Sequence, residues 1–178
     1  MTKKTKTYEF GVNSFGDIAL DNNNKPLTDA ASIRQVVDEA VLADKLGVDV
    51  VGLGEHHRAD FAISSPEMVL AAIASKTKRI KLTSAVTVLS SDDPVRVFER
   101  FSTLDAVSNG RAQIIIGRGS FTESYPLYGF DLRDYETLFE EKIELMAELL
   151  KETPVTWSGT MRPALQDADV FPKTEGGS

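Results

Sequence analysis

The chain has two histidines, and they stand side by side in the segment Glu55-His56-His57. This segment follows a Val-rich stretch, residues 48–53, that is typical of a buried strand. In parallel α/β folds, functional side chains gather at the C-terminal ends of strands. A histidine at such an end can accept or donate a proton near neutral pH. It can equally be part of a polar rim, so the motif alone leaves both roles open.

A metal site at this segment is the weaker interpretation. Consecutive residues of an extended chain point to opposite sides, so only Glu55 and His57 could share a ligand direction. No third ligand follows nearby, and the chain contains no cysteine, which excludes disulfides, thiolate metal sites and a cysteine nucleophile. We therefore expect no metal.

Two further predicted strands contain or lead into residues that could bind a ligand. The stretch 80–89 passes through Thr83-Ser84-Ala85, and the stretch 112–116 leads into Gly117-Arg118-Gly119. The two glycines permit a close backbone approach and the arginine supplies a fixed cation, which together suit a phosphate group. A flexible turn with a solvated arginine fits the same residues.

Helical patterns separate these strands. Apolar residues recur at spacings of three and four over 32–46, and Gly47 provides a left-handed stop. Ser64 and Glu67 form a capping box, with Pro66 at the first helical position, before a helix over 68–75. Further helices are predicted over 94–107 and 135–150.

The predicted strands and helices alternate, which indicates an α/β fold with a parallel sheet. Together with a first strand over 8–15, they give four βα units over 8–150 within a single domain, 1–178. Residues 1–7 are expected to be a disordered lead and 151–178 an irregular tail with a short strand at 155–157. Periodicity alone does not distinguish an open doubly wound sheet from half of a closed TIM-type barrel.

Composition limits the possible partners. A formal net charge of -7 and a pI near 4.9 argue against nucleic acid or an anionic membrane surface as the main partner. No stretch approaches the roughly 18 apolar residues that a membrane helix needs. We expect a cytoplasmic protein.

Several motifs, in this order along the chain, carry a resemblance to a known family: Phe10-Gly11-Val12, Gly54-Glu55-His56-His57, Thr83-Ser84-Ala85-Val86-Thr87-Val88-Leu89, Asp93-Pro94-Val95-Arg96, Leu104-Asp105, Asn109-Gly110-Arg111 and Gly117-Arg118-Gly119. Together they resemble the bacterial luciferase-like flavin-dependent monooxygenases. The resemblance covers about 8–172 and corresponds to the N-terminal half of that family.

The resemblance implies a (β/α)8 barrel of which this chain supplies the first four units. It also implies reduced FMN as cofactor, delivered by a separate flavin reductase, and oxygen as co-reactant in the oxidation of a small organic substrate. Family members form homodimers through the second and third helices, here about 66–75 and 94–107. Phe15, Phe61 and the loop 117–133 suggest a mostly apolar substrate lining.

The resemblance also assigns roles to residues by position. His56 matches the active-site histidine, and Glu55 is its neighbour in the cofactor site. Ser84-Ala85 matches a non-proline cis peptide that supports the flavin ring. Arg118, followed by Gly119, matches the arginine that reaches the flavin phosphate.

The departure from the family is length, because the sequence stops after the fourth helix. A truncated enzyme is the leading hypothesis, and a half-barrel would have two open sheet edges and an exposed, concave apolar face. A deazaflavin-dependent oxidoreductase that transfers hydride is the second hypothesis. A non-catalytic assembly module that forms an obligate dimer is the third.

Overall fold

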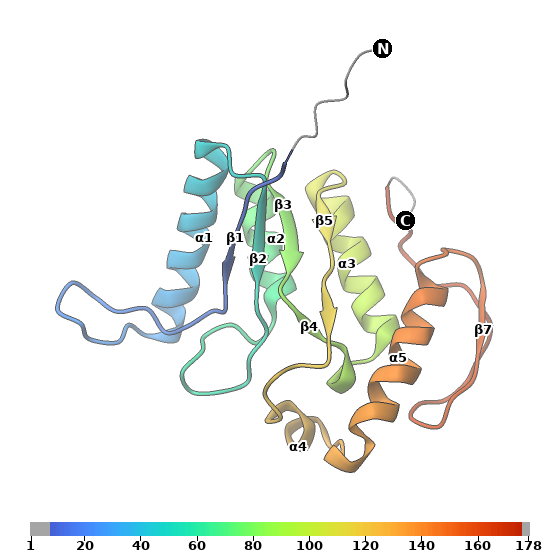
Figure 1. Cartoon of the computed structure of the whole chain (residues 1–178). Helices are drawn as coiled ribbons and strands as arrows, with labels where there is room; N and C mark the ends of the chain where they lie inside the picture. The colour runs from blue at the N-terminus through green and yellow to red at the C-terminus, as the bar shows by residue number, and fades with distance from the viewer. Residues whose placement is uncertain (1–7, 176–178) are drawn as a thin grey trace.

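The computed structural model describes residues 8–175, and its strands and helices alternate along the chain (Figure 1). The strands are β1 (Gly11–Ser14), β2 (Val50–Leu53), β3 (Lys81–Ser84), β4 (Thr87–Val88), β5 (Ala112–Gln113), β6 (Ile116–Gly117), β7 (Val155–Trp157) and β8 (Leu165–Ala168). The helices are α1 (Asp29–Leu46), α2 (Pro66–Lys76), α3 (Pro94–Ser108), α4 (Ser124–Tyr128) and α5 (Tyr135–Leu149), with 3-10 turns at Leu89–Ser91 and Leu132–Asp134.

The main sheet is parallel and its strands follow sequence order. Four strands pair as β1-β2-β3-β5, and β4 and β6 form a further parallel pair. Helices α1, α2 and α3 lie on one face of this sheet, and α5 packs beside α3 (Figure 1). Sequential strands with helices on a single face are the arrangement of a (β/α) barrel, whereas a doubly wound sheet carries helices on both faces.

The core lies between the sheet and these helices. Val51, Leu53 and Leu82 of the strands are between 0% and 4% exposed and belong to one hydrophobic cluster with helix residues such as Leu70 and Val97. Burying one such Leu side chain contributes about 1.5 to 3 kcal/mol. This packing determines which side chains of each strand face the helices. It therefore also determines the directions of the side chains at the strand ends.

The predicted end of α1 is confirmed, and the predicted start of α2 is confirmed only in part. Gly47 ends α1 in the left-handed conformation, as predicted, although α1 begins at Asp29, where Thr28 caps it. The predicted capping box of Ser64 and Glu67 is wrong. Ser65 is the N-cap of α2 and makes no side-chain cap hydrogen bond. Pro66 takes the first helical position, so Glu67 stands one position too early for a capping box and instead pairs with an arginine.

The third and fourth predicted strands are each divided in two. The stretch 80–89 forms β3 and β4, and the non-proline cis peptide between them joins Ala85 to Val86, not Ser84 to Ala85 as predicted. The Ser84 hydroxyl donates to the Ile115 carbonyl and accepts from the Ile115 N–H, at 3.0 and 3.2 Å. This side chain therefore links the two divided strands at the point where backbone pairing is interrupted.

The last part of the chain holds more structure than expected. The loop 117–133 contains α4 and a 3-10 turn. The predicted strand at Val155–Trp157 is present, but it pairs with an unpredicted strand, Leu165–Ala168, as an antiparallel hairpin. The predicted disordered lead, 1–7, lies outside the described residues.

The sheet face away from the helices is not the apolar surface expected. In this register, Asn13, Gly52 and Thr83 are aligned partners, and Gln113 aligns with Thr83. Side chains alternate along a strand, so these residues point away from the buried Val51 layer. Apart from Val50, which aligns with Gly11 and Lys81, small and polar residues therefore occupy this face along the main sheet.

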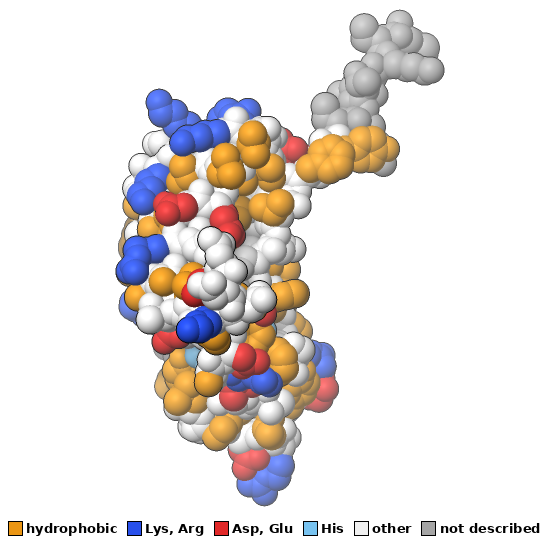
Figure 2. Space-filling view, turned by 90° about the vertical axis from the view of Figure 1, so that its left-hand side faces the viewer, with side chains coloured by type: hydrophobic (Ala, Val, Ile, Leu, Met, Phe, Trp, Pro, Cys, Tyr) orange, Lys and Arg blue, Asp and Glu red, His pale blue; other side chains and the backbone are white. Residues whose placement is uncertain are grey.

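Exposed apolar side chains lie instead at the open edge of β1. Tyr8 and Phe10 are 72% and 75% exposed, and Val12 of β1 is 46% exposed. Figure 2, which looks from the side of α1, shows hydrophobic groups scattered among charged ones on this face. β1 and β5 are the two ends of the main sheet, as predicted for open edges.

One partly buried guanidinium joins the N-terminal ends of the strands to the C-terminal ends of α2 and α3. Arg111 donates to the carbonyl oxygens of Ala74, Thr77, Ile80 and Ser108, and to the Thr77 hydroxyl, at 2.7 to 3.3 Å. These acceptors come from α2, the start of β3 and the end of α3. A planar guanidinium with five N–H groups can satisfy them together, whereas an ammonium cannot.

We therefore expect Arg111→Lys to lower the free energy of unfolding by about 2 kcal/mol or more, since several charge-assisted hydrogen bonds to buried carbonyls are lost. Urea denaturation followed by circular dichroism measures the change. Arg96→Lys is the matched control, because the Arg96 side chain is 67% exposed, and it should change stability by less than about 0.5 kcal/mol. Equal effects of the two substitutions would contradict this role of Arg111.

Candidate active site

A cavity of about 250 Å³ lies at the C-terminal ends of β1, β2, β3 and β6. It is lined by Phe15, Glu55, His56, His57, Ala85, Val86, Val88, Gly119, Ser120, Phe121, Glu123 and Ser124. These residues follow four different strands, as expected when parallel strands end at the same edge. Four of the residues predicted for the site, Glu55, His56, Ala85 and Gly119, thus lie on one cavity.

Aromatic rings surround His56. Its imidazole stacks on Phe61 at 4.0 Å between ring centroids, and it meets Phe15 and Phe121 edge-on at 6.1 and 5.2 Å. Among the described residues, no hydrogen bond is formed by either nitrogen of this ring. The His56 ring is therefore positioned by packing, and both nitrogens are available to a ligand.

This apolar surrounding controls the charge of His56. Burial lowers the pKa of His56 below its ordinary value, and the field of nearby carboxylates, Glu123 first among them, opposes the shift. Desolvation disfavours the charged imidazolium. His56 is consequently an uncharged proton acceptor at neutral pH.

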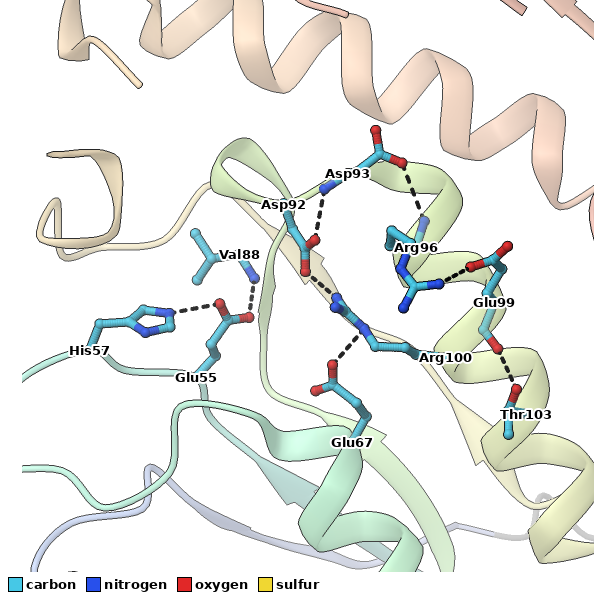
Figure 3. A network of polar contacts seen from close by, with 10 residues as sticks. All are labelled: Glu55, His57, Glu67, Val88, Asp92, Asp93, Arg96, Glu99, Arg100 and Thr103. Carbon is cyan, nitrogen blue, oxygen red and sulfur yellow. Dashed lines mark hydrogen bonds and ion pairs between the residues drawn. The ribbon is translucent and has the colours of Figure 1, made fainter. Parts of the chain in front are cut away.

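His57 points to a different environment. Its Nε2 lies 3.0 Å from Oε1 of Glu55, and the other carboxylate oxygen accepts the Val88 N–H at 2.9 Å (Figure 3). Only 6% of the His57 side chain and 9% of the Glu55 side chain are exposed. Glu55 is therefore held by β4, and it holds His57.

A second polar cluster lies next to Glu55 (Figure 3). Arg100 of α3 pairs with Glu67 of α2 at 2.6 Å and with Asp92. Burial raises the pKa of Glu67, against the opposing field of Arg100. This cluster joins α3 to the N-terminal end of α2, next to the segment after β2 that carries Glu55.

The glycines around Arg118 have a packing role. A Cβ at Gly117 would lie 2.7 Å from a Val86 methyl, and a Cβ at Gly119 would lie 2.8 Å from a Val88 methyl. Gly119 also has a φ of +79°, which side chains rarely adopt. The glycines let this segment lie against the two valines, so the pattern does not depend on a phosphate.

Arg118 and Ser84 are not among the residues that line the cavity. Arg118 pairs with Glu136 of α5 at 2.5 Å, and its guanidinium carbon lies 4.8 Å from the centroid of the Phe139 ring. The Ser84 side chain is fully buried and engaged with Ile115, as described above. Neither contact involves the His56 ring.

Sequence reasoning missed a polar pocket behind Glu55. This pocket of about 350 Å³ is lined by Glu55, Glu67, Arg100, Lys142 and Arg162, among others. Lys142 is 3% exposed, and its ammonium donates to the Ser90 carbonyl at 2.6 Å. Burial lowers the pKa of Lys142 to about 8. The signal was available, because Lys142 interrupts the apolar stripe of its helix.

We expect the imidazole of His56 to titrate below its ordinary midpoint of about 6.5. Replacing Phe61 by Ala exposes the ring to water and should move the midpoint upward, since less desolvation opposes protonation. Proton NMR on the two histidine rings measures both values, with His56→Gln for assignment. Phe171→Ala, at a residue 62% exposed, is the control. A midpoint unaffected by Phe61→Ala would contradict the importance of the aromatic cage.

Curated proteins of known activity are similar to this chain in sequence. Limonene 1,2-monooxygenase of Rhodococcus erythropolis is 32% identical over 151 residues, which are 84% of this chain and 39% of that protein. The chain thus spans about two fifths of the length of this curated relative.

Two solved structures share the fold at lower identity. The oxygenating constituent of 3,6-diketocamphane monooxygenase of Pseudomonas putida, in complex with FMN, has a TM-score of 0.77 and 21% identity, over 89% of this chain and 44% of that chain. The coenzyme F420-dependent tetrahydromethanopterin reductase of Methanopyrus kandleri has a TM-score of 0.67 and 21% identity. The match covers 95% of this chain and 47% of that chain.

A family model described as luciferase-like monooxygenase matches residues 8–178, almost the whole chain. The cavity that contains His56, the motifs around it and the parallel βα arrangement agree with this match. The chain belongs to the luciferase-like monooxygenase family.

Proposed function

We propose that the four βα units are half of a (β/α)8 barrel and that the cavity around His56 binds reduced FMN for the oxygenation of a small organic substrate. The observation that carries this proposal is the packing of the His56 imidazole, whose ring nitrogens form no hydrogen bond among the described residues, against three phenylalanine rings near the strand ends. The FMN complex of a structural neighbour supports the choice of cofactor. A separate flavin reductase would supply the reduced form.

The lining fits a flat, largely apolar ring with a few polar atoms. Ala85 and Val86 present small apolar side chains to the cavity, and Phe121 covers it from the loop after β6. The Ser124 hydroxyl is buried and has no partner among the described residues, although it lines the same cavity. A buried unpaired hydroxyl is costly, so a ligand atom that bonds to it would be stabilising.

Each residue would have a defined task. Reduced flavin, when bound, supplies the electrons for the reduction of oxygen and the transfer of one oxygen atom to the substrate. His56 would accept or return a proton at a ring nitrogen, and its lowered pKa keeps it ready to accept one. The phenylalanine rings would shield the reacting groups from water in part, because Phe15 is 58% and Phe121 37% exposed.

A deazaflavin is the second candidate cofactor, favoured by the likeness to an F420-dependent reductase. In that case the reaction would be hydride transfer without oxygen. Parallel titration with reduced FMN and with a reduced deazaflavin separates the two candidates.

The first test is FMN binding to the purified chain, followed by flavin fluorescence. Arg118 pairs with Glu136 and would have to turn away from it to reach the flavin phosphate. We expect Arg118→Ala to weaken binding about tenfold or more, since a charge-assisted contact to phosphate would be lost. Arg133→Ala is the matched control, because the Arg133 side chain is 88% exposed and pairs with Asp131. Binding that is equally affected by both changes would contradict the phosphate role, and absence of binding would contradict the proposed cofactor site.

The outer faces of α2 and α3 support a homodimer, which we propose as the assembly. Met68 of α2 and Val107 of α3 are 70% and 54% exposed, and both line a shallow groove between the two helices. Exposed apolar side chains grouped on neighbouring helices are typical of protein interfaces.

Met68→Glu and Val107→Glu should each raise the dimer dissociation constant about tenfold or more, because a charge would be buried in an apolar interface. Analytical ultracentrifugation measures the constant. Leu46→Glu is the control, since Leu46 is 74% exposed on α1 and lies outside the groove. A chain that is monomeric at all concentrations would refute the dimer.

A further inference from the structure

The second histidine, His57, is held in one orientation by the carboxylate of Glu55. Figure 3 shows Glu55 between His57 and the backbone of Val88, with one carboxylate oxygen directed to each. The Val88 N–H can only donate, so it fixes one oxygen of Glu55 as an acceptor. The carboxylate therefore cannot turn without losing this bond, and its other oxygen stays directed at His57.

This geometry selects one tautomer of the His57 ring. An ionised carboxylate can only accept hydrogen bonds, so the 3.0 Å contact requires the proton on Nε2 of His57. When the ring is neutral, Nδ1 then carries a lone pair. No residue in the described range 8–175 forms a hydrogen bond with Nδ1.

The ring is also restrained in orientation. Tyr128 meets it edge-on, with centroids 5.3 Å apart and planes at 88°. His57 is 6% exposed yet lines the same cavity as His56. His56 is thus held by packing alone, whereas His57 is held by a carboxylate and one aromatic contact.

We infer that His57 is a second functional histidine of the cavity, and that Glu55 is its positioning residue. Glu55 keeps the proton on Nε2, so that Nδ1 is presented as an acceptor for an N–H group of the bound reduced flavin. This inference rests on the proposed function for the identity of the ligand. The tautomer itself depends only on the chain.

The chain has only two histidines, so nitrogen NMR on histidine-labelled protein gives two ring systems. His56→Gln assigns them. At a pH at which the His57 ring is neutral, we expect Nε2 to show the chemical shift of a protonated nitrogen and Nδ1 the chemical shift of an unprotonated one. Glu55→Gln should produce a mixture of both tautomers, because an amide can donate as well as accept.

Glu67→Gln is the matched control, since Glu67 lies in the neighbouring cluster and pairs with Arg100 instead of His57. It should leave the His57 tautomer unchanged. A wild-type ring protonated on Nδ1, or a tautomer that does not respond to Glu55→Gln, would overturn the positioning role. Circular dichroism of each variant establishes that it is folded.

The ligand role is tested by adding reduced FMN anaerobically to the labelled chain. We expect a shift of the Nδ1 signal of His57, and about tenfold weaker binding in Glu55→Gln, which corresponds to one hydrogen bond of about 1.4 kcal/mol. Binding of FMN without any change at Nδ1 would overturn the acceptor role and leave the proposed function intact. Failure of FMN to bind would overturn both, and Glu55 and His57 would then be a structural pair.

Discussion

The parallel pairing of β1, β2 and β3 places their last residues, Ser14, Leu53 and Ser84, side by side. The cavity depends on this register, because Phe15, Glu55 and Ala85 each follow one of these strand ends. A slip of one residue would turn every side chain of a strand to the other face. Burial of the Val51 and Leu82 layer beneath the helices prevents such a slip, so the packing of one face organises the site at the end of the sheet.

The two histidines of one segment lie in two different environments. His56 is surrounded by phenylalanine rings and has a lowered pKa, whereas His57 is bonded to a buried carboxylate. Neighbouring residues of an extended segment diverge, and here the divergence leads to two environments that differ in polarity. Acid and base roles in enzymes are commonly separated by such differences in environment.

The polar contacts behind the cavity connect it to the helices. Glu55 is bonded to β4, and the neighbouring Arg100 joins α2 and α3 through Glu67 and Asp92. The proposed dimer would use the outer faces of the same two helices.

The motifs in the sequence determined the family, and the hydrophobic periods determined the alternation of strands and helices. Both are local properties, since periodicity and the left-handed stop at Gly47 need only neighbouring residues. The cavity position of His56 also followed from the rule that parallel strands end at one edge, whereas Ala85 was expected there only from the family resemblance.

Only the tertiary structure decided which contacts the polar residues make. Glu67 looked like a capping residue but pairs with Arg100, which is distant in sequence. The pairing of His57 with Glu55, the closeness of Gly119 to Val88 and the burial of Lys142 depend on how separate elements meet. Spacing along the chain predicts which face a residue occupies, but the partner on the opposite element is set by packing in three dimensions.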